Sequence, residues 1–313
     1  MRNIKTCEFV SPMHPDKICD RLADSLLDEY LAQDPKSRVA IEIMGGHKHV
    51  GVSGEVASAA DVDIPKIIRN IVGQDYDVSV RITRQSSFIA QGVEAGGAGD
   101  QGIMIGYATR ETPNFMPAEY QMARGLCQKI YDKFPYDGKT QVTIEDGRVT
   151  AVVASFQKTK NDILLALVKD IIKAEEYLIN PAGEWEQGGF EADTGLSGRK
   201  IVIDNYGPEI GIGGGSFSGK DYTKVDRSGA YMARRIAVDL LQKRNAGTVR
   251  AKLAYAIGKS EPVMAAAEID GATELITGYD LTPRGIYEFL ELKKVKYSQT
   301  AAWGHFGREF SWK

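Results

Sequence analysis

Hydrophobic positions recur along the chain in a fixed order of helical and strand-like stretches. From about Asp16 to Ala32 they follow the spacing of one helix face, which predicts an amphipathic helix. Two strand-like runs follow, Val39–Met44 and Val50–Val56, and a short Gly45-Gly46 turn region separates them. A helix next to a two-stranded hairpin is therefore expected near the start of the chain.

A second helix and a third strand complete this first unit. Asp63 is a suitable N-cap residue because its carboxylate can accept a hydrogen bond from the first amides of a helix, and Pro65 fits the first turn. Apolar positions then recur through Ile71, and a strand is predicted from Val78 to Ile82.

The same order returns twice downstream, at intervals of roughly a hundred residues. Asp146-Gly147 is predicted to form the hairpin turn of the second unit, and Leu281-Thr282-Pro283 to start the last helix of the third. The further predicted helices are Ala118–Asp132, Asp162–Glu176, Asp226–Lys243 and Thr282–Leu292, and the further strands are Thr140–Ile144, Val149–Phe156, Val249–Ile257 and Val263–Ile269.

This repetition predicts an α+β fold of three similar domains in a pseudo-threefold arrangement. An ordinary α+β protein can also produce this order by chance, and identity between the units is too low to decide. The expected division is an N-terminal domain at 1–84, a loop and linker at 85–102, a central domain at 103–187 and a C-terminal domain at 188–313. Residues 84–102 lack periodicity and form either a mobile lid or a connector. Residues 180–198 are a second irregular stretch.

Composition narrows the function classes. The chain has 313 residues and a net charge of -3, so its overall charge gives no attraction to nucleic acid or to an anionic membrane. No apolar run approaches the length of a membrane span, and the first residues lack the apolar core of a signal peptide. The cysteines Cys7, Cys19 and Cys127 have no metal-ligand spacing, which predicts reduced thiols and a cytoplasmic protein.

A glycine-rich run from Gly213 to Lys220 is the strongest candidate for chemistry. Glycine lets backbone amides approach a phosphate closely, and the lysine can neutralise its oxygens. The spacing resembles a Walker loop, but Asp221 replaces the Ser or Thr that such a loop needs. With Lys224, Asp226 and Arg227 close behind, the run suits a polyphosphate held by cations and a carboxylate-bound metal, or else a solvated loop before a helix.

A second candidate lies at the start of the first helix, in Ser11-Pro12-Met13-His14-Pro15-Asp16-Lys17. Helix N-termini favour anions, and here a histidine, a carboxylate and a lysine gather at one. A capped helix with one surface histidine explains the same residues.

Further charged groups lie in loops. They are Asp137-Gly138-Lys139 and the segment Asp193–Lys200, after which a strand Ile201–Ile203 is predicted. Thr300–Glu309 is a compact aromatic run that either lines a pocket or packs as a terminal turn. The sequence has no Cys-His pair, nucleophile elbow or zinc spacing, which favours chemistry by positioning and electrostatics over a covalent nucleophile.

Taken in order, these motifs resemble the S-adenosylmethionine synthetase (methionine adenosyltransferase) family nearly from end to end. The matching motifs are His14-Pro15-Asp16-Lys17, Gly99-Asp100-Gln101-Gly102, Gly198-Arg199-Lys200, Gly213–Asp226 and Gly304-His305-Phe306-Gly307-Arg308-Glu309. The resemblance implies three α+β domains and a homodimer with shared active sites, often paired into a tetramer. It implies attack of the L-methionine sulfur on C5′ of ATP, and release of tripolyphosphate that is then cleaved to pyrophosphate and phosphate.

The resemblance also implies roles for individual residues. His14 would lie beside the departing O5′, and Gln85 would open a mobile loop over the site. The implied catalytic residues are His14, Lys139, Arg199 and Lys220, and the implied methionine contacts are Glu55, Gln85, Asp100, Asp193 and Lys224. The implied ATP contacts are His14, Asp137, Lys139, Trp185, Asp193, Arg199, Lys200, Ser216 and Lys220. Asp16 and Asp226 would bind two Mg²⁺ ions, and Glu42 would bind K⁺.

Some positions depart from the family pattern. Pro12-Met13 replaces an acidic residue and glycine, Glu184-Trp185 stands in place of Arg-Phe, and Ser216 replaces a common alanine. The loop after Gln85 is also short. Two alternatives remain: a magnesium-dependent nucleotide kinase or phosphohydrolase, against which Asp221 argues, and a non-catalytic subunit that keeps the fold.

Overall fold

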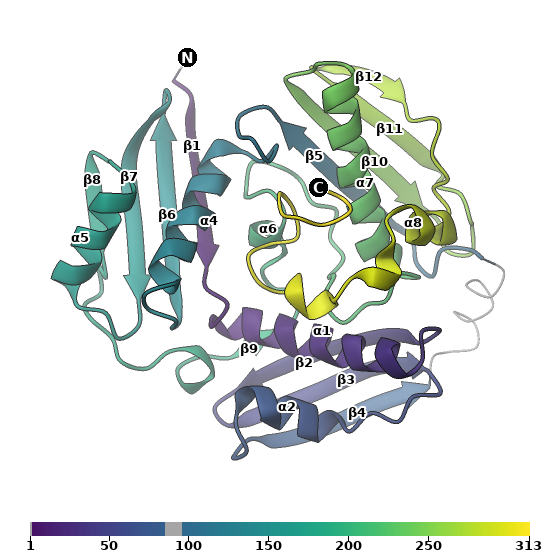
Figure 1. Cartoon of the computed structure of the whole chain (residues 1–313), viewed down its shortest axis with the longest axis horizontal. Helices are drawn as coiled ribbons and strands as arrows, with labels where there is room; N and C mark the ends of the chain where they lie inside the picture. Colours follow the sequence, from purple (N-terminus) through teal and green to yellow (C-terminus); the bar gives the residue numbers. More distant parts are fainter. Residues whose placement is uncertain (1, 85–95) are drawn as a thin grey trace.

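The computed structural model describes residues 2–84 and 96–313, which form three four-stranded sheets with helices packed against them (Figure 1). The sheets surround a central region occupied by loops, by α6 (Ile201–Asp204) and by the C-terminal segment. This arrangement agrees with the predicted α+β fold of three similar units. No helix within the described ranges is long and apolar enough to cross a membrane.

The first sheet has the strand order β4-β3-β2-β9. Its strands are β2 (Arg38–Gly46), β3 (His49–Ala57), β4 (Asp77–Arg84) and β9 (Gly195–Leu196). In β2, Val39, Ile41 and Ile43 are fully buried while Glu42 and Met44 are exposed, so the strand alternation turns one face toward α1 (Pro15–Gln33) and α2 (Ile64–Val72). As predicted, Asp63 caps α2, because its carboxylate accepts a hydrogen bond from the amide of Lys66 at 3.1 Å.

The second sheet has the order β1-β6-β7-β8, with α4 (Ala118–Tyr131) and α5 (Asn161–Ile171) beside it. Its strands are β1 (Ile4–Val10), β6 (Gly138–Glu145), β7 (Arg148–Phe156) and β8 (Glu176–Ile179). The third sheet has the order β12-β11-β10-β5 and packs on α7 (Val225–Lys243), against which α8 (Pro283–Phe289) lies. Its strands are β5 (Gly102–Thr109), β10 (Thr248–Tyr255), β11 (Met264–Ile269) and β12 (Ala272–Leu275).

The three sheets exchange strands along the chain. β1 pairs with β6 of the second sheet, β5 pairs with β10 of the third, and β9 pairs with β2 of the first. The hydrophobic pattern did not predict these three strands. Each joins a sheet whose other strands lie far away in the sequence, and local periodicity carries no information about such pairing.

Two sequence predictions about local structure are wrong. Ile201–Ile203, predicted as a strand, forms the short helix α6, and the amide of Asp204 closes its turn on the carbonyl of Lys200 at 2.8 Å. The helix predicted to reach Glu176 ends at Ile171, and Glu176 begins β8. Short apolar runs fit either state, so neighbouring elements decide the outcome.

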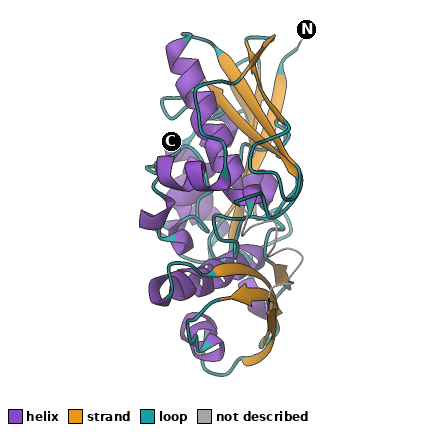
Figure 2. Ribbon diagram, turned by 90° about the vertical axis from the view of Figure 1, so that its right-hand side faces the viewer, coloured by secondary structure: helices purple, strands orange, loops and turns teal. Residues whose placement is uncertain are grey.

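Each sheet leaves one face open, and helices cover the other (Figure 2). The strand register places exposed apolar side chains on all three open faces: Ile4 and Leu178, Met44 and Leu196, and Ile103 and Leu275. The covered faces hold the core. One buried cluster lies under the first sheet, and a second, larger cluster is shared by the other two.

Candidate active site

The N-terminus of α1 carries the first predicted site residue. His14 is the N-cap, and its Nδ1 accepts a hydrogen bond from the Asp16 amide at 3.2 Å. The pKa of His14 lies well below its usual value, because the ring is buried and because Lys200 and Lys139 add positive charge nearby. The ring is therefore neutral, and with Nδ1 as the acceptor its proton is assigned to Nε2. His14 offers one N–H donor.

Asp16 joins α1 to the segment after β9. Its side chain is fully buried, and it accepts bonds from the Leu196 amide at 2.9 Å and from the Lys200 ammonium, while Arg199 Nε lies 3.0 Å away. Burial alone would raise the pKa of Asp16, but the bonds from Lys200 and Leu196 lower it below its usual value. The carboxylate is ionised and already faces two cations.

Lys17 corrects one sequence interpretation. We expected its charge at the helix N-terminus to favour an anion, but the ammonium is buried and bonds to Asp20 at 2.9 Å and to Asp204 at 2.5 Å. It ties α1 to α6 and is not open to a ligand.

The start of β6 and the segment after β8 lie beside His14. Asp137 is buried and accepts the Gly189 amide at 2.8 Å. A Cβ on Gly188 would lie 2.8 Å from Trp185 and 2.9 Å from Asp137, so these two predicted nucleoside contacts flank one glycine. Lys139 and Asp193 are exposed, and both charges act on the pKa of His14. We call His14, Asp16, Asp137, Lys139, Trp185, Asp193, Arg199 and Lys200 the His14 group.

The glycine-rich segment supplies a second set of residues. Lys220 bonds to Asp226 at 2.8 Å, and both side chains are mostly buried, with 17% and 12% exposure. A Cβ on Gly215 would lie 2.0 Å from Asp226 Cγ, so only glycine lets the segment pass this carboxylate. Ser216 lies against the Gly198 backbone. We call Lys220, Asp226, Ser216 and Glu42 the Lys220 group.

Glu42 and Glu55 lie on the open face of the first sheet. Both are exposed, and the antiparallel register of β2 and β3 puts them on the same face. The pKa of Glu42 is raised, mainly because protein atoms crowd its carboxyl, while bonding from Ser197 at 2.5 Å and the charge of Lys220 oppose the shift. Glu42 therefore lies between the Lys220 ammonium and the segment that carries Arg199.

Asp221 and Lys224 have a structural environment. Asp221 is fully buried and accepts bonds from the amides of Val39 and Thr223 and from Lys224 Nζ, at 2.6, 2.8 and 2.7 Å. The position that a Walker loop fills with a metal-binding hydroxyl thus fastens the glycine segment to β2. Among the remaining predicted residues, Asp100 is exposed next to β5, and Gln85 lies outside the described residues.

Within the described ranges, no three His, Cys, Asp or Glu side chains gather as a ready-made metal site. The predicted metal residues Asp16 and Asp226 are instead single carboxylates, each beside a lysine. Mg²⁺ in nucleotide enzymes is commonly held by one or two carboxylates plus substrate phosphates, so this donor set fits a metal that arrives with a polyphosphate.

Three domain models of one known protein family match the chain along nearly its whole length. The N-terminal domain of S-adenosylmethionine synthetase matches residues 2–93, its central domain matches 95–185 and its C-terminal domain matches 187–313. The chain belongs to the S-adenosylmethionine synthetase family. Its complete set of domains makes it a methionine adenosyltransferase, which forms S-adenosylmethionine from ATP and L-methionine and hydrolyses the released tripolyphosphate.

This synthetase chemistry suits a site without a covalent nucleophile. A thioether sulfur is already nucleophilic, so the barrier depends on alignment of sulfur and C5′ and on stabilisation of a highly charged leaving group. Single cations on several loops are a charge arrangement of the kind that the second requirement calls for.

The structure explains one departure from the family pattern. Glu184 points to the start of α5, where it accepts the Asn161 amide at 3.0 Å and pairs with Lys160 at 2.7 Å. Its charge is thus neutralised locally, next to the half-buried Trp185. The aromatic run at the C-terminus is packed: His305 and Phe306 are buried. The sequence left two interpretations of this run, a pocket lining and a packed terminal turn, and the structure supports the packed turn.

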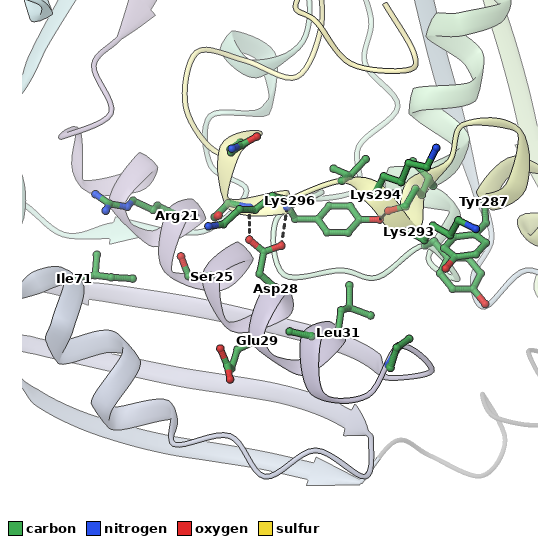
Figure 3. Close-up of a pocket in the computed structure, with 18 residues that line it drawn as sticks. Arg21, Ser25, Asp28, Glu29, Leu31, Ile71, Tyr287, Lys293, Lys294 and Lys296 are labelled. Carbon is green, nitrogen blue, oxygen red and sulfur yellow. Dashed lines mark hydrogen bonds between the residues drawn. The ribbon is translucent and has the colours of Figure 1, made fainter.

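Sequence reasoning missed the acidic residues further along α1. Asp20 and Asp24 are 1% and 0% exposed and accept amides from the segments that carry Lys200 and Lys220. Their spacing of four residues after Asp16 was the available signal. A cavity of about 1070 Å³ between α1 and residues 292–299 is lined by none of the predicted site residues that the structure describes (Figure 3).

Proposed function

We propose that the His14 group and the Lys220 group together form the methionine adenosyltransferase site. Arg199, Lys200, Lys139 and Lys220 would neutralise the triphosphate, and the neutral His14 would donate its Nε2–H to the departing O5′. This assignment is supported by the lowered pKa of His14 and by the assembly of Arg199 and Lys200 around Asp16.

The nucleoside and methionine contacts are part of the same proposal. Asp137, Trp185 and Asp193 would contact the nucleoside, with Ser216 near the phosphates. Glu55, Gln85, Asp100, Asp193 and Lys224 would bind methionine. Lys224 is mostly buried and bonded to Asp221, so this role requires only the edge of its ammonium that remains accessible.

We propose Asp16 and Asp226 as the protein ligands of two Mg²⁺ ions and Glu42 as a ligand of K⁺. When bound, Mg²⁺ would neutralise charge that develops on the phosphate oxygens. The chain's own contribution is positioning: Lys200 and Lys220 pair with these carboxylates and orient them at the edges of their loops. The crowded environment of the exposed Glu42 carboxyl suits a weakly bound monovalent cation.

We propose that the active form is a homodimer with shared sites, which can pair further into a tetramer. The three open sheet faces lie on one side of the molecule (Figure 2). Apolar side chains on these faces are exposed. Glu42, Glu55 and Lys139 are on the same faces. Burial of apolar area against a second copy would stabilise such a dimer and enclose these charged residues.

A cytoplasmic location belongs to the same proposal, and the buried free thiols of Cys7, Cys19 and Cys127 support it. The observation that carries the functional proposal is Asp16, a fully buried carboxylate that gathers Arg199 and Lys200 next to a neutral histidine.

One assay tests the site assignment. The protein is incubated with ATP, methionine, Mg²⁺ and K⁺, and the sulfonium product and phosphate are measured. Wild type should form both, and product should disappear without methionine. His14→Ala should lose product formation while keeping the fold by circular dichroism, whereas exchange of the exposed Lys133 for Ala should change nothing. Normal turnover in His14→Ala would remove this residue from the site.

A further inference from the structure

Four aspartates occur along α1 at intervals of four residues, so they follow one face of the helix. Each accepts backbone amides from a segment distant in the sequence. Asp16 accepts Leu196, Asp20 accepts Gly198, Asp24 accepts Gly219, and Asp28 accepts Tyr297 and Ser298, at distances between 2.7 and 3.0 Å. We call these four residues the α1 carboxylate row; Figure 3 shows Asp28 with its two bonds.

The two middle members hold the phosphate-facing loops. The Asp20 bond to Gly198 precedes Arg199 and Lys200 directly, and the Asp24 bond to Gly219 precedes Lys220 directly. Positions four apart on a helix differ by about 6 Å along its axis. The row therefore holds two cationic segments next to each other, one after Gly198 and one after Gly219.

Asp20 and Asp24 each form an ion pair with a buried cationic side chain. Lys17 bonds to Asp20 at 2.9 Å, and Arg227 bonds to both oxygens of Asp24 at 2.7 and 2.8 Å. Arg227 also donates to the carbonyl of Lys220 at 3.1 Å, so the second loop is held at two adjacent residues. The two ion pairs fix the orientation of the Asp20 and Asp24 carboxyl groups, which keeps the acceptor oxygens aimed at the amides.

We propose that Asp20 and Asp24 are positioning residues for adenosyl transfer: they set the distance between the Arg199–Lys200 segment and Lys220. The inference builds on the site proposed above. Neither aspartate has an open face toward a substrate, because both are buried and their oxygens are bonded within the protein. Their effect on the reaction must pass through the two loops.

Asp20 is the better test position. After exchange for Ala or Asn, Lys17 still has Asp204 as a partner, whereas removal of the Asp24 carboxylate would leave the buried Arg227 without one. Asp20→Asn keeps an oxygen acceptor for the Gly198 amide, and Asp20→Ala removes it. Asp28→Ala is the matched control, since Asp28 belongs to the same row but holds residues 297 and 298.

The experiment compares the full-length variants by steady-state kinetics, thermal midpoint and amide hydrogen exchange. We expect kcat/KM for ATP to fall about tenfold to a hundredfold in Asp20→Ala, with a smaller loss in Asp20→Asn, because a displaced loop misplaces its cations. Exchange should accelerate in the peptide that contains Gly198. Asp28→Ala should lose thermal stability and exchange protection near Ser298, with kcat/KM within about twofold of wild type.

The proposal is overturned if folded Asp20→Ala keeps wild-type exchange at Gly198, or if its kcat/KM for ATP stays within about twofold of wild type. An equal kinetic loss in Asp28→Ala would also overturn it. If Asp20→Ala does not fold, the same criteria apply to Asp20→Asn. Lys200→Ala separates this result from the site assignment: normal activity there would defeat the site itself, whereas loss there with normal Asp20 variants would defeat only the positioning role.

Discussion

The two cationic loops of this synthetase are built in opposite ways. Arg199 and Lys200 pair with Asp16, which lies more than 180 positions away in the sequence and is fully buried. Lys220 pairs with Asp226, which is only six positions away and whose side chain is 12% exposed. The same ligand chemistry can thus come from a tertiary ion pair or from a local one, and the two should respond differently to mutation.

The largest expected effect concerns the anchor of the second loop. Asp24→Ala should lower the free energy of unfolding by about 3–5 kcal/mol, because it leaves the buried Arg227 charge unpaired. Urea unfolding measures this loss.

The partly buried Asp28 provides the control for Asp24, since its exchange for Ala removes amide bonds but strands no buried cation. Equal losses of unfolding free energy in Asp24→Ala and Asp28→Ala would show that leaving Arg227 unpaired adds no cost of its own.

The next effect is on turnover. Lys200→Ala and Lys220→Ala should each lower kcat about 10²–10³-fold, because each removes one charge that stabilises the leaving triphosphate. Steady-state formation of S-adenosylmethionine measures both.

Stability separates the two lysine variants. Lys200→Ala should also lower the unfolding free energy by about 1–3 kcal/mol, since Asp16 is buried and loses a bonded partner. Lys220→Ala should cost less stability than Lys200→Ala, because the Asp226 side chain keeps 12% exposure to water whereas that of Asp16 has none. A larger loss of unfolding free energy in Lys220→Ala than in Lys200→Ala would show that the tertiary ion pair is not the more stabilising of the two.

The smallest effect is a pH dependence of stability. His305 is buried, with Nδ1 2.8 Å from the Tyr231 hydroxyl, and burial together with the charges of Arg227, Lys17 and Arg308 keeps its pKa well below the usual value. In the unfolded chain, His305 binds a proton below about pH 6.5, whereas in the folded protein the buried ring stays unprotonated at that pH. Stability should therefore be complete above that pH and fall below it, by up to about 1.4 kcal/mol per pH unit.

Unfolding curves between pH 7 and pH 5 measure this slope. His305→Gln should flatten it while the contribution of His14 remains. An unchanged slope in the variant would show that His305 is not the titrating group.

Much of the fold followed from the sequence because helices and hairpins are local. The periodicity predicted α1, α4 and α7 and the strands β2, β3, β6 and β7. The Asp63 cap and the start of the last helix at Leu281-Thr282-Pro283 were also correct. The domain division at 84, 102 and 187 stays a prediction. So do the roles of individual site residues, including Gln85.

What the sequence by itself determined is the inventory: the order of elements, the motifs of the family and the side chains that carry the chemistry. The tertiary structure decided which distant partners meet. β1, β5 and β9 pair with strands that are far from them in the sequence. Lys17, which we expected to favour an anion, forms buried ion pairs within the protein instead. The physical reason is that periodicity and capping act within a few residues, whereas strand pairing and buried ion pairs depend on which groups the folded chain removes from water together.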